Sequence, residues 1–186
     1  MRRPWPLSGM IILLVVVGCA KGMTTPWSPP SEDPRAQAAR YVLATATAFR
    51  TVYTQGVVEH TKRSGVAAKE EWIADEHAVM LPAQFVKAVG FEIKDFELGM
   101  IGLTPIYETN RPRTQAEAEA LRTLAAHPET RVLTFADGNQ FKGIVADFAI
   151  AQTCADCHNT HPKSPKKDFR QGDLMGGIIV RFSDSH

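Results

Sequence analysis

The stretch TRVLTFADGNQFKGIVADFAI, residues 130–150, decides the fold. Two runs rich in β-branched and aromatic residues flank Asp137-Gly138-Asn139, and this arrangement predicts a hairpin of two antiparallel strands joined by a tight turn. Another apolar run, GGIIVRF at residues 176–182, predicts a buried last strand. The C-terminal part of the chain is therefore expected to supply three strands of one mainly antiparallel sheet.

A long helix is predicted at the start of the folded part, from about Arg35 to Lys62. Asp33 is a residue type that caps helices, and Pro34 fits the first helical position. Apolar residues at spacings of three and four give this helix one apolar face, made by Val42, Ala46, Phe49, Tyr53 and Val57.

Shorter elements are predicted between this helix and the hairpin. They are helices over residues 68–76, 82–89 and 114–128 and a strand over residues 96–107. Thr114 and Glu117 form a capping box at the start of the last of these helices. The order helices, strand, helix and three strands predicts an α+β fold with one mainly antiparallel sheet.

A motif with strong chemical meaning follows the hairpin, in a segment expected to be a loop: QTCADCHNTHPKSP, residues 152–165. Two thiols at this separation reach the two vinyl groups of one haem, and a histidine directly after the second thiol can bind the iron. The motif predicts one covalent haem c, with thioethers from Cys154 and Cys157 and His158 as the proximal iron ligand.

Cysteine pairs of this spacing also occur in zinc sites and in redox dithiols. A zinc site needs four ligands, and the only other cysteine of the chain is Cys19, close to the N-terminus. A dithiol of the thioredoxin kind usually lies at a strand-to-helix turn early in its fold, whereas Cys154 and Cys157 lie near the C-terminus. Both alternatives are therefore weaker than haem attachment.

The N-terminus has the pattern of an export signal. Arg2 and Arg3 precede an apolar run at residues 11–17, which is far shorter than the about 20 residues needed to span a bilayer. The end of this run, VVGC at residues 16–19, resembles a bacterial lipobox and implies lipidation of Cys19, and Ala20 directly after it fits sorting to the outer membrane. We therefore expect a lipid-anchored protein at the periplasmic face of a bacterial membrane, bound to the membrane through the anchor only.

Composition adds little about partners. A formal net charge of +1 on 186 residues provides no broad basic field, so no nucleic-acid partner is expected. The length suits one domain with a tether rather than two domains.

Several segments together resemble the bacterial family of haem-c-binding PAS-like domains, formerly a domain of unknown function. The most specific is CADCHNTHPKSPKKDFRQGDLMGGIIVRF at residues 154–182, and the others are RTVYTQGVV, LPAQF and LTPIYETNRPRTQAEAEAL. The resemblance covers about residues 40–182 and implies a PAS-like antiparallel sheet flanked by helices, with haem bound before the final strand. Family members occur as stand-alone exported cytochromes and as sensor modules fused to signalling domains, and the end of this chain at His186 favours the stand-alone form.

The chain is accordingly divided into three parts. Residues 1–18 are a lipoprotein signal peptide and residues 19–34 a proline-rich tether. Residues 35–186 are the haem-c-binding PAS-like domain.

The sequence leaves the sixth iron position open. Some members of the wider family use a cysteine from the upstream helical region, which this chain does not have. His77, in ADEHAVMLPAQF, is the first candidate, although a solvated histidine among acidic neighbours is an equal alternative. His60 is the second candidate because it continues the apolar face of the long helix, and Met80 and Met100 rank lower since methionines at apolar positions usually fill cores.

Residues after the motif are expected to surround the haem. His161 is three residues past His158 and is expected to contact either the groups around the iron ligand or a propionate rather than the iron itself. A basic cluster follows that could pair with propionates, with an acidic redox partner or only with water: Lys163, Lys166, Lys167 and Arg170. DLMGG at residues 173–177 is expected to turn the chain tightly into the last strand.

Three functions compete on these observations. The leading hypothesis is an exported monohaem c-type cytochrome for electron transfer or redox response, with a redox partner protein. The alternative is a haem-based sensor of nitric oxide or carbon monoxide with an exchangeable sixth position, acting through a partner. The third is an enzyme, a small peroxidase in which a histidine or arginine near a vacant iron position would assist O–O cleavage. A peroxidase usually needs electrons from a second redox centre, and nothing in the sequence supplies one. A second copy of the chain is a candidate partner for the apolar helix face.

Overall fold

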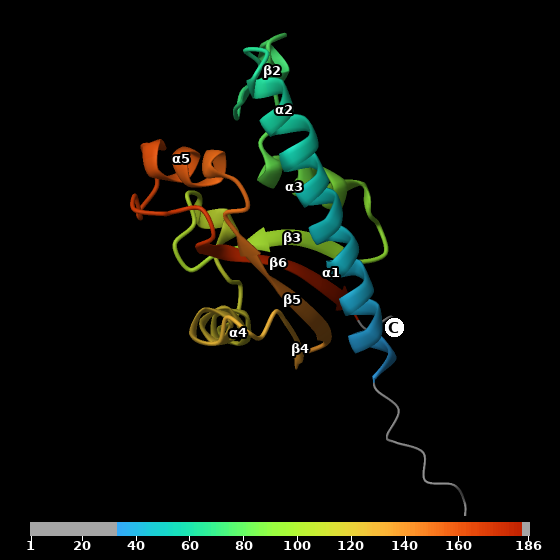
Figure 1. The fold of residues 1–186 in the computed structure, drawn as a ribbon. Coiled ribbons are helices and arrows are strands. Elements are labelled where there is room, and N and C mark those ends of the chain that lie inside the picture. The colour runs from blue at the N-terminus through green and yellow to red at the C-terminus, as the bar shows by residue number, and fades with distance from the viewer. Residues whose placement is uncertain (1–32, 184–186) are drawn as a thin grey trace, which may run out of the picture. The chain divides into compact units, whose positions relative to one another are not determined.

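Residues 33–183 are the part of the chain that the computed structural model describes (Figure 1). Their centre is a four-stranded antiparallel sheet in the order β3-β6-β5-β4. Its strands are β3 (Glu97–Ile101), β4 (Val132–Asp137), β5 (Gln140–Phe148) and β6 (Leu174–Ser183). The predicted α+β class with one antiparallel sheet and flanking helices is confirmed. The predicted signal peptide, Cys19 and the tether as far as residue 32 lie outside the described residues.

The hairpin of β4 and β5 has the predicted tight turn. Asp137 pairs with Gln140, so only two residues connect the strands. Gly138 in this connection has φ +62°, a left-handed conformation that glycine adopts without a steric cost. Residues 141–147 of β5 are all buried, because both faces of this central strand are covered.

The long N-terminal helix is also confirmed. It runs without interruption through α1 (Pro34–Val52), a π-helical segment η1 (Tyr53–Val58) and α2 (Glu59–Lys62). The Asp33 carboxylate accepts a hydrogen bond from the Arg35 backbone N–H at 2.8 Å, which satisfies one free donor of the first turn. Among the helices of residues 33–183, none combines the length and the apolar character needed to cross a membrane.

The helix predicted over residues 68–76 is wrong. The segment begins at the end of a short strand, β1 (Ala67–Ala68), and contains a 3₁₀ turn, η2 (Trp72–Ala74). A second short strand, β2 (Ala78–Val79), follows it and pairs with β1 in parallel. The Asp75 side chain accepts a hydrogen bond from the His77 N–H at 2.8 Å and also pairs with Lys69. An aspartate that bonds the backbone in this way favours a turn over a helix.

The other predicted elements are present with different bounds. The helix α3 (Pro82–Glu92) begins at the predicted proline. The strand predicted over residues 96–107 ends as β3 at Ile101, and a loop with Pro105 and the 3₁₀ turn η3 (Glu108–Asn110) follows. The Gly102 N–H donates to the Asn110 carbonyl at 2.9 Å within this loop, and Pro105 cannot donate to a strand ladder, so the strand does not continue.

The capping box of α4 (Gln115–Ala126) is half confirmed. The Thr114 hydroxyl accepts a hydrogen bond from the Glu117 N–H at 3.2 Å, as predicted. The Glu117 carboxylate does not return to the Thr114 backbone but accepts from the Arg113 N–H at 2.8 Å. It points instead into the interior, where it meets cationic side chains of the sheet.

The two faces of the sheet carry separate cores, because side chains alternate along each strand. Helices α1 and α3 pack on one face, where Val145, Ile178 and Val180 join residues such as Leu43 and Val86. On the other face the apolar core is made by Ile101, Ala120, Leu121, Leu124, Ile144, Ala146 and Ile179, and it includes helix α4.

Close packing of α1 on the sheet requires a glycine. A Cβ atom on Gly143 would lie 2.8 Å from the Ala39 Cβ and 3.1 Å from a Leu43 methyl group. A larger residue at this position of β5 would therefore push α1 away from the strand.

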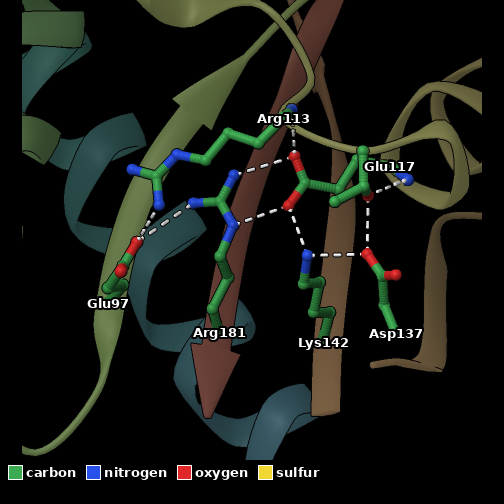
Figure 2. A network of polar contacts seen from close by, with 7 residues as sticks. Glu97, Arg113, Glu117, Asp137, Lys142 and Arg181 are labelled. Atoms are coloured by element: carbon green, nitrogen blue, oxygen red, sulfur yellow. Dashed lines mark hydrogen bonds and ion pairs between the residues drawn. The ribbon is translucent and has the colours of Figure 1, made fainter. Parts of the chain in front are cut away.

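A network of polar and ionic groups that is buried at its centre accompanies α4 (Figure 2). We call it the α4 network; its members are Glu97, Arg113, Thr114, Glu117, Asp137, Lys142 and Arg181. Glu117 is fully buried and accepts hydrogen bonds from Lys142 at 2.8 Å and from Arg181 at 2.7 and 3.0 Å. Burial alone would raise the pKa of Glu117, but these hydrogen bonds lower it to about 2.

Candidate functional site

The Cys-Ala-Asp-Cys-His motif lies on a helix, so the predicted loop is wrong. This helix, α5 (Gln152–Thr160), contains no glycine or proline, and it ends at His161, whose extended ψ of 127° fits a residue before proline. Cys154, Cys157 and His158 are spaced three and four residues apart and therefore share one helix face. The helix thus presents all three predicted haem-binding side chains in the same direction.

This helix face borders a cavity of about 340 Å³, a size typical of ligand sites. Cys154, Cys157 and His158 all line it. The other walls come from the π-helical region of the long helix, the start of α3, the end of β3 with its following loop, and the facing ends of β5 and β6. Segments from most of the folded chain therefore converge on the three motif residues.

The His158 ring is oriented by a contact with Phe169, which lies in the loop after α5. Its ring makes an edge-on contact with Phe169, with centroids 5.5 Å apart and planes at 83°. Asn159 fixes the position of Phe169 through two hydrogen bonds: its amide donates to the Phe169 carbonyl at 2.8 Å and accepts from the Phe169 N–H at 2.9 Å. Helix α5 and the loop after it are therefore clamped together beside the imidazole.

Burial and the neighbouring side chains favour the neutral form of His158. Burial lowers the pKa of His158, and the nearby His161 and Arg50 lower it further. Its Nδ1 atom is buried without a hydrogen-bond partner. A neutral imidazole is the form that binds metal ions, and an unpaired buried ring nitrogen is uncommon in structural histidines.

The Cys157 thiol does not have the character of a reactive redox thiol. Cys154 and Cys157 are free and half-buried. Burial raises the pKa of Cys157, with smaller contributions from Glu70 and Cys154, whereas catalytic thiols have a lowered pKa. Within residues 33–183 no three His, Cys, Asp or Glu side chains are grouped so that they could hold a metal ion.

A buried ion pair that the sequence did not reveal lines the same cavity. Arg50 of α1 contacts Asp147 of β5 at 3.1 Å, and the two residues are only 5% and 7% exposed. Burial raises the pKa of Asp147 to about 6, although Arg50 opposes this shift. The only signal in the sequence is a single charged residue within each of two otherwise apolar stretches.

Tyr107 and Glu70 form a second polar contact on the cavity wall. The Tyr107 hydroxyl donates to the Glu70 carboxylate at 2.6 Å, and this hydrogen bond is the main reason that the pKa of Tyr107 rises to about 12. His161 lies 3.6 Å from the same carboxylate and packs edge-on against the Tyr107 ring. His161 does not line the cavity, so its predicted contact with a propionate stays a prediction.

The two histidine candidates for the sixth iron ligand lie elsewhere. His77 and His60 are both exposed, and neither is among the residues that line the cavity. The His60 Nδ1 is 2.9 Å from an Arg63 nitrogen. The structure therefore does not bring them together with His158.

Two methionines do line the cavity. Met100 comes from β3, and Met175 comes from the start of β6. Met175 lies at a register shift, because Asp147 pairs with Gly176 while Phe148 pairs with Leu174. An extra residue in a strand redirects side chains and is common next to functional sites. Met80, the other methionine that the sequence suggested, does not line the cavity.

The four residues of the basic cluster belong to the loop after α5, and none of them lines the cavity. Lys166 pairs with Asp168 and lies 4.4 Å above the Phe169 ring, and Lys163 lies 5.1 Å from the Tyr107 ring. The turn into β6 is slightly earlier than predicted: it is made by Gly172, with φ +94°, before β6 begins at Leu174. Contact of this cluster with a propionate or a redox partner stays a prediction.

Comparison with known proteins identifies the fold and the family. The crystal structure of the cyanobacterial haem protein Tll0287 is similar, with a TM-score of 0.58 and 15% identity, over 83% of this chain and 98% of that one. No curated protein matches the chain. The model of the Tll0287-like family matches residues 31–183. The family resemblance of the sequence is thereby confirmed, and the chain belongs to the Tll0287-like family.

Proposed function

We propose that this protein binds one haem covalently through Cys154 and Cys157, with His158 as an iron ligand, and acts as a monohaem c-type cytochrome. The observation that carries the proposal is the shared face of α5, from which all three side chains line one cavity. The similar fold of a cyanobacterial haem protein supports it. The raised pKa of Cys157 argues against the alternative of a reactive dithiol.

The residues present fit this group. The two thiols can each form one thioether, and the half-buried His158, whose pKa is lowered by burial, has a ring nitrogen without a hydrogen-bond partner. Haem, when bound, supplies one-electron chemistry whose potential depends on axial ligation, hydrogen bonding and burial. The chain contributes orientation through the Phe169 and Asn159 clamp, and it limits access of water through the largely apolar walls of the cavity.

The proposed setting follows from the N-terminal sequence. Export through the signal at residues 1–18 brings the chain to the compartment where haem is attached to cysteines, and lipidation of Cys19 would anchor it at the periplasmic face, with the outer membrane favoured. A redox partner protein would exchange electrons with it. The role proposed first is single-electron transfer or redox response.

One observation favours a second candidate, a sensor of nitric oxide or carbon monoxide. His158 is the only histidine among the described residues that line the cavity. If neither Met100 nor Met175 binds the iron firmly, the sixth position is exchangeable, and a small gas can bind there. The sensing function then requires a partner that detects the bound state.

The first test is a mass and absorption measurement on the exported protein. We expect the mass of one haem, resistant to extraction with acidified acetone, and loss of this mass in the Cys154→Ala/Cys157→Ala variant. A protein without bound haem, or with haem that is fully extractable, contradicts covalent attachment. A reduced spectrum that carbon monoxide does not change supports electron transfer, and a shift on addition of the gas supports the sensor.

A further inference from the structure

Arg50 is a charged residue at a position where the fold provides few partners for it. It lies on α1 and is 5% exposed, so its guanidinium is largely removed from water. The structure gives it one ion-pair contact, from a terminal nitrogen to the Asp147 carboxylate at 3.1 Å. Its Nε atom is buried and has no hydrogen-bond partner.

This arrangement is costly unless a further acceptor is present. A guanidinium has five N–H donors in a planar fork, and a buried donor left unpaired is destabilising, more so when the group is charged. An interior position for such a group is therefore more typical of a binding site than of a stabilising contact.

The other charged residues on the cavity wall do not share this property. The Lys87 ammonium donates to the Asn110 side chain at 3.1 Å, and this lysine is exposed. Glu70 accepts from Tyr107. Among the described charged residues that line the cavity, Arg50 alone has a donor that is both buried and unpaired.

We propose that Arg50, oriented by Asp147, is an anion-binding group of the cavity that binds a carboxylate or a small anion of similar charge. A planar guanidinium held by one carboxylate presents its remaining N–H groups to a second acceptor in fixed directions. The inference rests on the proposed haem function, which supplies two sources of such an anion. One is a propionate of the haem itself, and the other is a small anion bound from solution at the iron.

The test compares haem-loaded, full-length variants. Arg50→Gln/Asp147→Asn removes both charges together, so no buried charge is left unpaired and the net charge does not change. Arg50→Lys keeps the charge but loses the planar fork. Lys87→Gln is the matched control, because it removes a cation from the same cavity wall that already has a hydrogen-bond partner. Circular dichroism and haem content verify that each variant folds and is loaded.

Two readouts distinguish the sources. If the anion is a propionate, the propionate bending band in the resonance Raman spectrum shifts in the Arg50→Gln/Asp147→Asn variant and stays in place in Lys87→Gln. If the anion comes from solution, azide binding to the ferric protein, followed at the Soret band, weakens at least tenfold in the double variant and changes less than twofold in Lys87→Gln. Arg50→Lys is expected to show a smaller change of the same kind.

The inference is overturned if neither readout differs between the double variant and Lys87→Gln. It is likewise overturned if Lys87→Gln changes both readouts as strongly, because removal of any cation from the cavity wall would then have the same effect and Arg50 would have no special role. Absence of haem from the wild-type protein is a separate result, which contradicts the proposed function rather than the role of Arg50.

Discussion

Two buried pairs of carboxylate and cation lie on opposite faces of the sheet, and their surroundings differ. In the α4 network Glu117 accepts from Lys142, from Arg181 and from a backbone N–H, and Lys142 also contacts Asp137 at 2.7 Å (Figure 2). On the α1 face Asp147 has a single ion pair with Arg50, and that arginine keeps an unpaired donor. The first group is satisfied by its own neighbours, and the second borders the cavity that the motif residues line.

The pKa values follow the same division. Hydrogen bonds from two cations hold the pKa of Glu117 at about 2, whereas burial with one cation raises the pKa of Asp147 to about 6. A fully satisfied network stabilises one packing arrangement, and an incompletely satisfied pair is typical of a site built for a ligand. We therefore assign a structural role to the α4 network and a binding role to the Arg50–Asp147 pair.

The largest effect on stability is expected for Glu117→Ala. This change leaves Lys142 and Arg181 buried without their shared carboxylate, and breaking a buried ion pair in this way costs about 3–5 kcal/mol. Urea denaturation measures the free energy of unfolding. Glu119→Ala is the matched control, since its ion pair with Arg122 on the same helix is exposed and is expected to contribute less than about 1 kcal/mol. Equal losses in the two variants contradict the structural role.

A smaller loss is expected for Asp147→Asn. Burial already disfavours the charged form of the Asp147 carboxylate. Replacing it by a neutral amide loses the ion pair with Arg50 but also removes the cost of burying this negative charge, and the two effects partly cancel. We expect the free energy of unfolding to fall by about 1–3 kcal/mol, which is the usual cost of leaving a buried donor, here on Arg50, without its full partner. A loss as large as that of Glu117→Ala would remove the contrast between the two faces.

The two carboxylates also predict opposite responses to pH. The lowered pKa of Glu117 contributes stability that is present above its unfolded value of 4.5 and is lost as the pH falls toward 2. The raised pKa of Asp147 means that the folded state binds the extra proton, so its contribution is largest below 3.8 and is lost as the pH rises through about 6. Unfolding of the wild type and of Asp147→Asn should therefore be measured between pH 4 and 7.

In that range we expect the stability of the variant relative to the wild type to increase as the pH rises. A difference that is constant across the range shows that the Asp147 carboxylate does not titrate with a raised pKa in the folded protein. The α4 network is the same in both proteins, so the pH dependence that it contributes cancels when their free energies of unfolding are compared.

The elements with a clear periodicity could be predicted from the sequence, because their pattern depends on nearby residues only. The hairpin around Gly138 and the helix that ends at Lys62 are examples. The segment 68–76 could not be predicted, since the Asp75 side chain bonds to the backbone and forms a turn where residue preferences alone allow a helix.

The candidate site divides in the same way. Cys154, Cys157 and His158 could be selected as candidates because their spacing alone suggests a chemistry, and the structure places all three on one cavity wall, while their binding of haem stays a prediction. The Arg50–Asp147 pair joins a helix and a strand that are distant in the chain, so no local pattern reveals it. Met175 is similar, because its position in the cavity wall depends on a register shift between two strands.

The smallest effect is expected for the two histidines proposed as sixth ligand from the sequence. His60→Ala and His77→Ala should leave the absorption spectrum of the haem-loaded protein unchanged, because both side chains are exposed and neither lines the cavity. Met100→Leu and Met175→Leu are the matched variants on the cavity wall, and both keep the apolar volume.

If the wild-type spectrum is low-spin, conversion to high-spin in one methionine variant identifies that methionine as the sixth iron ligand. The ligand then comes from the cavity wall and not from the exposed surface. Conversion in a histidine variant instead means that the chain around residues 60 or 77 must move to reach the iron, and the cavity described in this structure is then not the complete site. A high-spin wild type that none of the four changes affects means that no side chain occupies the sixth position, and this outcome favours the gas sensor over the electron carrier.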